Sequence, residues 1–223
     1  PMMVSMLVQA LYNVVDSIFV SHVSESALTA VSLAFSLQNV MIAVGVGTGV
    51  GVNALLSKSL GEKNQGRANT TAENGIFLAL CSYVIFFVIG LTCMKPYFYA
   101  QTSDPDIALQ GIRYLRVCSV FSLGLFLQTM GEKLLAATGR TNLSMTSQLI
   151  GAVVNIVLDP IFIFGLGMGT GGAGTATALS QSISFCILLS MFLRGKTVSR
   201  FRITQVTRSA RDFGQIFFNG APS

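Results

Sequence analysis

Two aspartates, Asp16 and Asp159, lie inside long apolar stretches of the sequence. A charged side chain in the middle of a bilayer costs about 2.5–3.5 kcal/mol even on the lenient insertion scale, so each one needs a function or a partner. Tyr12 precedes Asp16 by one helical turn, and Asn155 precedes Asp159 at i−4, so each acid belongs to a polar stripe on one helix face. Intramembrane acids of this kind are typical of proton and ion pathways.

The depths of these polar stripes predict that they meet. At 1.5 Å per residue, Asp16 lies roughly 21 Å and Asp159 roughly 24 Å from the first residue of its own apolar stretch. Thr177, which begins an i, i+4, i+7 stripe with Gln181 and Ser184, reaches a comparable depth from the opposite direction. Two carboxylates that share a partly dry cavity repel each other when both are ionised, which favours the binding of a proton or a monovalent cation. The alternative interpretation is a set of structural hydrogen bonds between helices.

Backbone features accompany the polar stripes. Pro160 directly follows Asp159, and because proline has no N–H, it disturbs the local helical hydrogen bonding and predicts a bend. Glycines crowd the second apolar stretch, and we interpret them as a face for close helix contact. They are Gly45, Gly47, Gly49 and Gly51.

Membrane-spanning helices are the elements that must position these residues. The chain has 223 residues, of which 52% are hydrophobic and 10% charged, and its mean hydropathy of +0.66 is too high for an ordinary soluble domain. A spanning helix needs about 20 mostly apolar residues. Stretches of that kind occupy residues 2–22, 28–57, 74–94, 115–138, 143–165 and 173–193. The sequence therefore predicts an all-α integral membrane protein built as a six-helix transmembrane bundle.

The end of the chain predicts a boundary between two units. We expect a six-helix transmembrane lobe over residues 1–194, a basic cytoplasmic loop over 195–212, and the truncated start of a seventh transmembrane helix over 213–223.

Most of the basic residues behind the net charge of +5 follow the second, fourth and sixth stretches, which predicts the orientation in the membrane. The opposite loops carry only Lys95, Arg113 and Arg116, offset by Glu25, Asp104 and Asp106. The basic residues that follow these three stretches are Lys58, Lys63, Arg67, Arg140, Arg194, Lys196, Arg200, Arg202, Arg208 and Arg211. The positive-inside rule places these loops and the N-terminus in the cytoplasm, as in a multi-pass protein of the cytoplasmic membrane. The basic stretch near residues 194–211 has little aromatic interleaving, which favours a loop beside anionic lipid over a nucleic-acid site.

Other ionisable residues carry weaker signals. Glu132 and Lys133 lie close to the cytoplasmic end of the fourth stretch, where both side chains are expected to snorkel to the headgroups, and Glu73 at the start of the third is interpreted in the same way. The four cysteines form no C-x-x-C pair, and the single histidine, His22, stands at a helix end. Nothing here predicts an enzyme or a bound cofactor.

Several segments resemble those of the multidrug and toxic compound extrusion (MATE) family, and the likeness covers essentially the whole chain. The segments are LYNVVDSIFV from Leu11 to Val20, VGTGVGVNALLSKSLGEKN from Val46 to Asn64, NIVLDPIFIFG from Asn155 to Gly165, and GAGTATALSQ from Gly172 to Gln181. The third is the most specific match. The family's first helix also carries a proline at which it bends, and Pro1 falls at that position.

The resemblance implies one lobe of a twelve-helix, two-lobe transporter, with the C-terminal lobe missing as its partner. It implies a cation site at Tyr12, Asp16, Asn155, Asp159 and Thr177, of which all but Tyr12 are possible sodium ligands. The implied function is antiport, in which organic cations, drugs or toxic metabolites leave the cell in exchange for protons or sodium. The alternatives are a lipid-linked sugar flippase of related architecture, for which a more cationic cavity is expected, and a membrane scaffold that does not transport.

Overall fold

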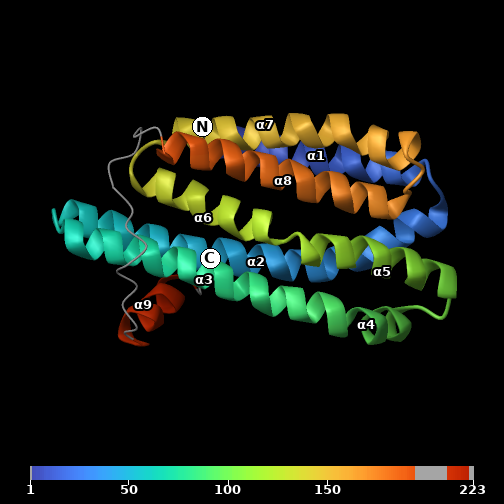
Figure 1. The fold of residues 1–223 in the computed structure, drawn as a ribbon, viewed down its shortest axis with the longest axis horizontal. Helices are drawn as coiled ribbons and strands as arrows, with labels where there is room; N and C mark the ends of the chain where they lie inside the picture. Colours follow the sequence, from blue (N-terminus) through green and yellow to red (C-terminus); the bar gives the residue numbers. More distant parts are fainter. Residues whose placement is uncertain (1, 194–209, 221–223) are drawn as a thin grey trace.

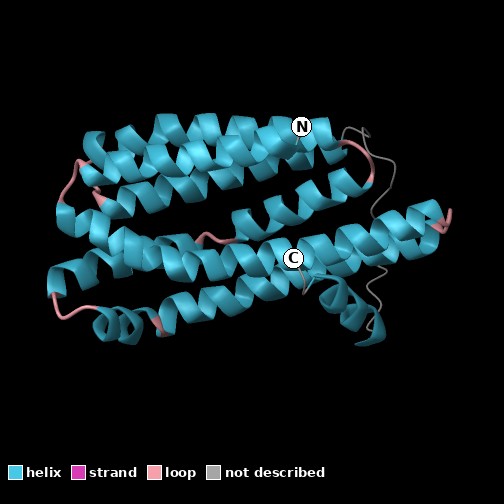
Figure 2. Ribbon diagram, turned by 180° about the vertical axis from the view of Figure 1, so that it is seen from behind, coloured by secondary structure: helices cyan, strands magenta, loops and turns pink. Residues whose placement is uncertain are grey.

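The computed structural model describes residues 2–193 and 210–220, which are helical apart from short connections and contain no strand (Figures 1 and 2). The all-α class predicted from the sequence is confirmed. The helices are α1 (Met2–Ser21), α2 (Glu25–Gly61), α3 (Gln65–Thr92), α4 (Met94–Gln101), α5 (Pro105–Val120), α6 (Leu123–Ala137), α7 (Thr141–Pro160), the π-helix η1 (Ile161–Gly165), α8 (Thr170–Leu193) and α9 (Ala210–Gly220).

The helices form an elongated bundle with two sides (Figure 1). Helices α1, α7 and α8 pack together on one side, and α2 and α3 pack together on the other. Helices α6 and α5 run end to end between them, and both contact α2 and α8. The short helix α9 lies against α2. The region between the two sides is therefore walled mainly by α2, α6, α7 and α8.

Four described helical segments are each long and apolar enough to cross a membrane alone, namely Glu25–Gly61, Gln65–Thr92, Thr141–Gly165 and Thr170–Met191. The fourth predicted span, residues 115–138, is not one continuous helix. It is divided into α5 and α6 by a turn at Phe121 and Ser122. The Ser122 hydroxyl donates to the Ser119 carbonyl oxygen at 2.7 Å, and such a local side-chain bond competes with the helical backbone pattern.

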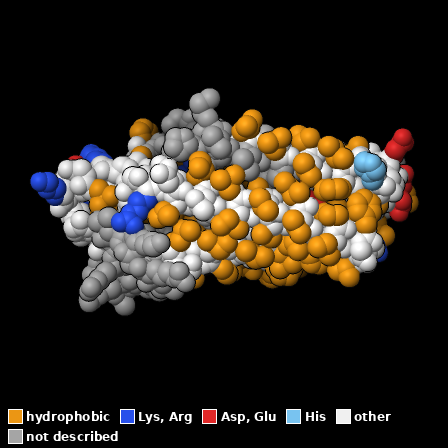
Figure 3. Space-filling view, turned by 90° about the horizontal axis from the view of Figure 1, so that it is seen from above, with side chains coloured by type: hydrophobic (Ala, Val, Ile, Leu, Met, Phe, Trp, Pro, Cys, Tyr) orange, Lys and Arg blue, Asp and Glu red, His pale blue; other side chains and the backbone are white. Residues whose placement is uncertain are grey.

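The outer surface of the bundle is apolar between two charged ends. On α1, the side chains of Leu7, Leu11, Val14 and Ile18 are exposed at helical spacing, which gives this helix an apolar outer face. Figure 3 shows apolar side chains spread between a basic end and an end with acidic side chains. We call these the basic end, with Lys58, Lys63, Arg67 and Arg140, and the acidic end, with Glu25, Asp104 and Asp106. A surface of this pattern suits a bilayer.

A glycine face on α2 brings α9 into backbone contact with it. A side chain at Gly51 would overlap the Ile216 carbonyl oxygen of α9, and one at Gly220 would overlap the Gly47 carbonyl oxygen. Glycine at these positions therefore permits a helix approach that no other residue allows. The interpretation of the α2 glycines as a packing face agrees with this contact.

Reciprocal hydrogen bonds fix α7 against α8. The Ser147 hydroxyl donates to the Ser184 carbonyl oxygen at 3.1 Å, and the Ser184 hydroxyl donates to the Ser147 carbonyl oxygen at 2.8 Å. Both serines are fully buried. These bonds set the register of the two helices that carry Asn155, Asp159 and Thr177.

Candidate cation site

Asp159 lies in the last turn of α7 and is 0% exposed. Its Oδ1 accepts a hydrogen bond of 3.2 Å from Nδ2 of Asn155, as the i−4 spacing allows. Within the described part of the chain, its Oδ2 has no hydrogen-bond partner. Because an unpaired buried carboxylate is costly, this oxygen is a candidate ligand for a proton or a cation.

The backbone changes its helical form directly after Asp159. Helix α7 ends at Pro160, and the chain continues as the π-helix Ile161–Gly165. The missing N–H of proline releases one α-helical hydrogen bond, and π-turns of this kind are frequent at functional sites. Pro160 therefore stands where a change of backbone geometry would move Asp159. The predicted bend at Pro1 lies outside the described residues.

Asp16 approaches Asp159 from α1, which packs along α7. It is 9% exposed, and its carboxylate is near enough to Asp159 for the two charges to interact. Its Oδ1 has no hydrogen-bond partner among the residues that the structure describes. Tyr12 lies one turn earlier on α1, but its side chain lies outside the description. Two acids from different helices thus share one buried region, as their depths in the sequence predict.

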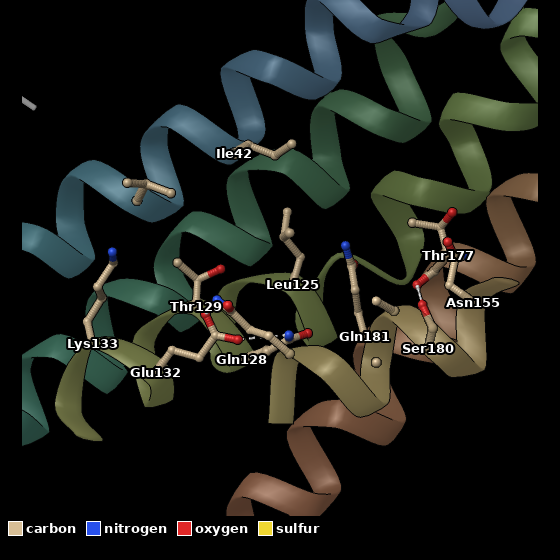
Figure 4. A pocket seen from close by; sticks show the side chains of 14 residues that line it. Ile42, Leu125, Gln128, Thr129, Glu132, Lys133, Asn155, Thr177, Ser180 and Gln181 are labelled. Atoms are coloured by element: carbon tan, nitrogen blue, oxygen red, sulfur yellow. Dashed lines mark hydrogen bonds between the residues drawn. The ribbon is translucent and has the colours of Figure 1, made fainter. Parts of the chain in front are cut away.

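A cavity of about 130 Å³ opens beside this acid pair and is walled by α2, α6, α7 and α8. Asn155 and Thr177 line its end nearest the acids, where Figure 4 shows their side chains close together. Oδ1 of Asn155 and Oγ1 of Thr177 lack hydrogen-bond partners in the described chain. Asp159 does not line the cavity itself, but it accepts a hydrogen bond from Asn155, which does.

The donor atoms of this region determine which ion it suits. Carboxylate, amide and hydroxyl oxygens from three helices are the hard ligands that alkali cations prefer, and a carboxylate also accepts a proton. In residues 2–193 and 210–220, no group of three or more histidine, cysteine, aspartate or glutamate side chains could hold a metal ion.

Glu132 was predicted to snorkel to the headgroups, and the structure corrects this. Its side chain is 8% exposed and lines the same cavity. Oε1 accepts a hydrogen bond of 3.0 Å from Gln128, and Oε2 accepts one of 2.6 Å from Gln148 of α7. Glu73 of α3 is likewise buried, at 4% exposed. The sequence signal that could have located Glu132 is Gln128 at i−4, the same spacing that joins Asn155 to Asp159.

The family model described as MatE matches residues 1–161 of the chain. The chain belongs to the MatE family. It is 26% identical over 224 residues to a multidrug export protein MepA of Staphylococcus haemolyticus, an alignment that covers 100% of this chain and 50% of the relative. It is 25% identical over 184 residues to an FAD transporter of Shewanella oneidensis, which covers 81% of this chain and 40% of the relative.

Solved structures agree with this assignment. The outward-facing conformation of a multidrug resistance MATE family transporter superposes with a TM-score of 0.94 at 30% identity, and the match covers 100% of this chain and 49% of that one. The chain therefore spans about half the length of the MatE relatives that it matches. Members of this family are multi-pass membrane proteins, which accounts for the apolar belt between the two charged ends.

Proposed function

We propose that the full-length protein is a secondary active exporter that exchanges small molecules for protons or sodium. In this proposal Asp16 and Asp159 carry the coupling cation, and Tyr12, Asn155 and Thr177 complete its site. The observation that carries the proposal is the pair of buried acids from α1 and α7, with carboxylate oxygens that lack partners in the described chain. A cation that binds there removes a large unpaired-charge cost, so its binding can drive a conformational change.

The positive-inside rule supports an orientation in the membrane, and the orientation indicates the side from which the cation enters. The basic end carries Lys58, Lys63, Arg67 and Arg140, so we place it and the N-terminus in the cytoplasm. The acid pair lies nearer the acidic end, so the cation enters from outside. For coupling, the affinity of the site for the cation must differ between the outward- and inward-open states.

The proposed substrates are small organic molecules, mainly cations, that bind between this lobe and a second lobe of the same protein. The name of the multidrug relative supports drug-like small molecules as substrates, and the half-length match supports the second lobe. The cavity of about 130 Å³ is smaller than the roughly 300–1,000 Å³ of small-molecule sites, as expected if a second lobe completes it. Because another relative is named an FAD transporter, FAD belongs in any substrate panel.

The test uses the full-length protein in proteoliposomes with an imposed proton or sodium gradient. Efflux of a fluorescent organic cation, and of FAD, is measured for the unchanged protein, for Asp16→Asn and for Asp159→Asn. We expect one gradient to drive efflux of at least one compound and both variants to lose it. The control is Asp106→Asn, which changes an exposed acid. Gradient-driven efflux retained in both site variants would contradict the proposal.

A further inference from the structure

Glu132 stands in a polar cluster of its own at the other end of the cavity. Gln128 and Gln148 each donate an amide hydrogen bond to its carboxylate, one from the same helix and one from α7. Figure 4 shows the Gln128 amide facing this carboxylate. Inside the described chain, the amide oxygens of both glutamines are buried without hydrogen-bond partners. A buried carboxylate and two unpartnered amide oxygens thus meet at one point of the cavity wall.

Among the described residues of the cavity wall, Lys133 is the one cation, and its charge interacts with the Glu132 carboxylate. However, the Lys133 stem packs against Gly49 of α2, and Figure 4 shows the side chain extending away from the Glu132 carboxylate. The described residues that α2, α7 and α8 contribute to the cavity wall are uncharged. Amide donors stabilise a carboxylate without neutralising it, so a mobile cation is the partner that would complete the cluster.

The same cavity extends from this cluster to Asn155, the hydrogen-bond partner of Asp159. On α7, Gln148 and Asn155 lie seven residues apart, which is about 10 Å along the helix axis. Gln181 and Ser180 of α8 line the wall between them, as Figure 4 shows. Polar side chains therefore line the cavity from Glu132 to Asn155, which donates a hydrogen bond to Asp159.

We propose that Glu132, Gln128 and Gln148 form a second binding site for a small monovalent cation, separate from the Asp16–Asp159 site and nearer the basic end. In the empty site the two amide N–H groups point at the carboxylate. When sodium arrives, both amides turn over, so that their oxygens join the carboxylate oxygens as its ligands. When a proton arrives instead, one carboxylate oxygen becomes an O–H donor, and one amide turns over to accept from it. That the cation is the coupling ion rests on the proposed function; the site itself does not.

The test measures cation-dependent stabilisation of the purified full-length protein in detergent. Its melting temperature is followed against sodium concentration at fixed pH, with potassium as the balancing ion, and against pH without sodium. The decisive background is the double variant Asp16→Asn/Asp159→Asn, in which the acid pair no longer carries charge. We expect stabilisation by sodium or by protons to persist in this background and to disappear when Glu132→Gln is added.

A second variant covers the case in which Glu132→Gln does not fold. Gln148→Met keeps the carboxylate and removes one amide, and in the double-variant background it should raise the half-saturating cation concentration about tenfold, the effect of one lost charge-assisted ligand. Asp106→Asn is the matched control and should change nothing. Cation-dependent stabilisation that is absent from the double-variant background, or unaltered by both Glu132→Gln and Gln148→Met, would overturn the second site.

The two proposals fail in different ways. If the second site is absent, the unchanged protein still shows gradient-driven efflux that depends on Asp16 and Asp159. If the proposed function is wrong, efflux does not follow a proton or sodium gradient, while binding at Glu132 is still measured in detergent.

Discussion

The carboxylates of Asp159 and Glu132 differ in the number of hydrogen-bond donors that hold them. Asp159 has one amide donor, Asn155, and a second acid, Asp16, nearby. Glu132 has two amide donors, one for each oxygen. A carboxylate with a like charge beside it gains more from a cation than one that is already held by two donors. The acid pair should therefore bind its cation more tightly, and Glu132 should exchange it more readily.

Removing the charge of each group separately gives the largest expected effect. Asp159→Asn should lower the initial rate of gradient-driven efflux about 100-fold, because the strongest cation ligand is lost. Glu132→Gln should lower it about tenfold, because the cation can still reach the acid pair. Efflux from proteoliposomes measures both rates. A loss in Glu132→Gln as great as in Asp159→Asn would reverse the proposed ranking.

Combining the two changes shows whether the groups act on one path. If the cation passes from one to the other, Asp159→Asn/Glu132→Gln should lose little more than Asp159→Asn alone, so the double-mutant cycle should give a coupling of about 1 kcal/mol. Independent paths would give losses that multiply. The measurement is the same efflux assay, with Asp106→Asn as the neutral partner in a control cycle.

Removing one amide donor from each group tests the difference in donors. Asn155→Ala should destabilise the protein by about 2 kcal/mol, because it leaves the buried Asp159 carboxylate without its donor. Gln128→Ala should cost only about 1 kcal/mol, because Gln148 still holds Glu132. Thermal unfolding in detergent without sodium at neutral pH compares them. Equal losses would mean that the second donor to Glu132 contributes nothing.

A change between the two groups should affect both slightly. A methyl group added at Gly151 would lie 3.1 Å from the Ser184 Cβ, so Gly151→Ala should shift α7 against α8 by a few tenths of an ångström. We expect a stability loss below about 1 kcal/mol and similar, small changes in cation affinity at both sites. Melting curves with and without sodium check this. Weakening at one site alone would show that α7 does not move as a unit.

The sequence predicted the acid pair better than the second group, and the reason is geometric. Helical rise and i−4 spacing are fixed quantities, so Asp16, Asn155, Asp159 and Thr177 could be placed at one depth from residue numbers alone. Their role in cation binding stays a prediction. Glu132 was misplaced because its side chain was expected to turn outward to the headgroups, whereas it turns inward to Gln128 and Gln148. The fourth span was predicted as one helix because the turn at Phe121 and Ser122 leaves no trace in hydropathy.

Contacts between residues far apart in the sequence could not be predicted either. The bond from Gln148 to Glu132 depends on the register between α6 and α7, which neither propensity nor hydropathy encodes. The glycine run on α2 did predict close packing, but its partners could not be read from the pattern. The partners are α9, which meets Gly47 and Gly51, and α6, which meets Gly45 and Gly49.

The backbone contact between α2 and α9 also suggests how to produce the protein as two polypeptides. No side chain separates the two backbones at Gly51 and Gly220, so their faces should rejoin without any side chain having to move aside. A gene divided between α8 and α9 would yield two polypeptides with matching faces. An isotopically labelled polypeptide could then be mixed with its unlabelled partner, which would simplify spectroscopy of either one.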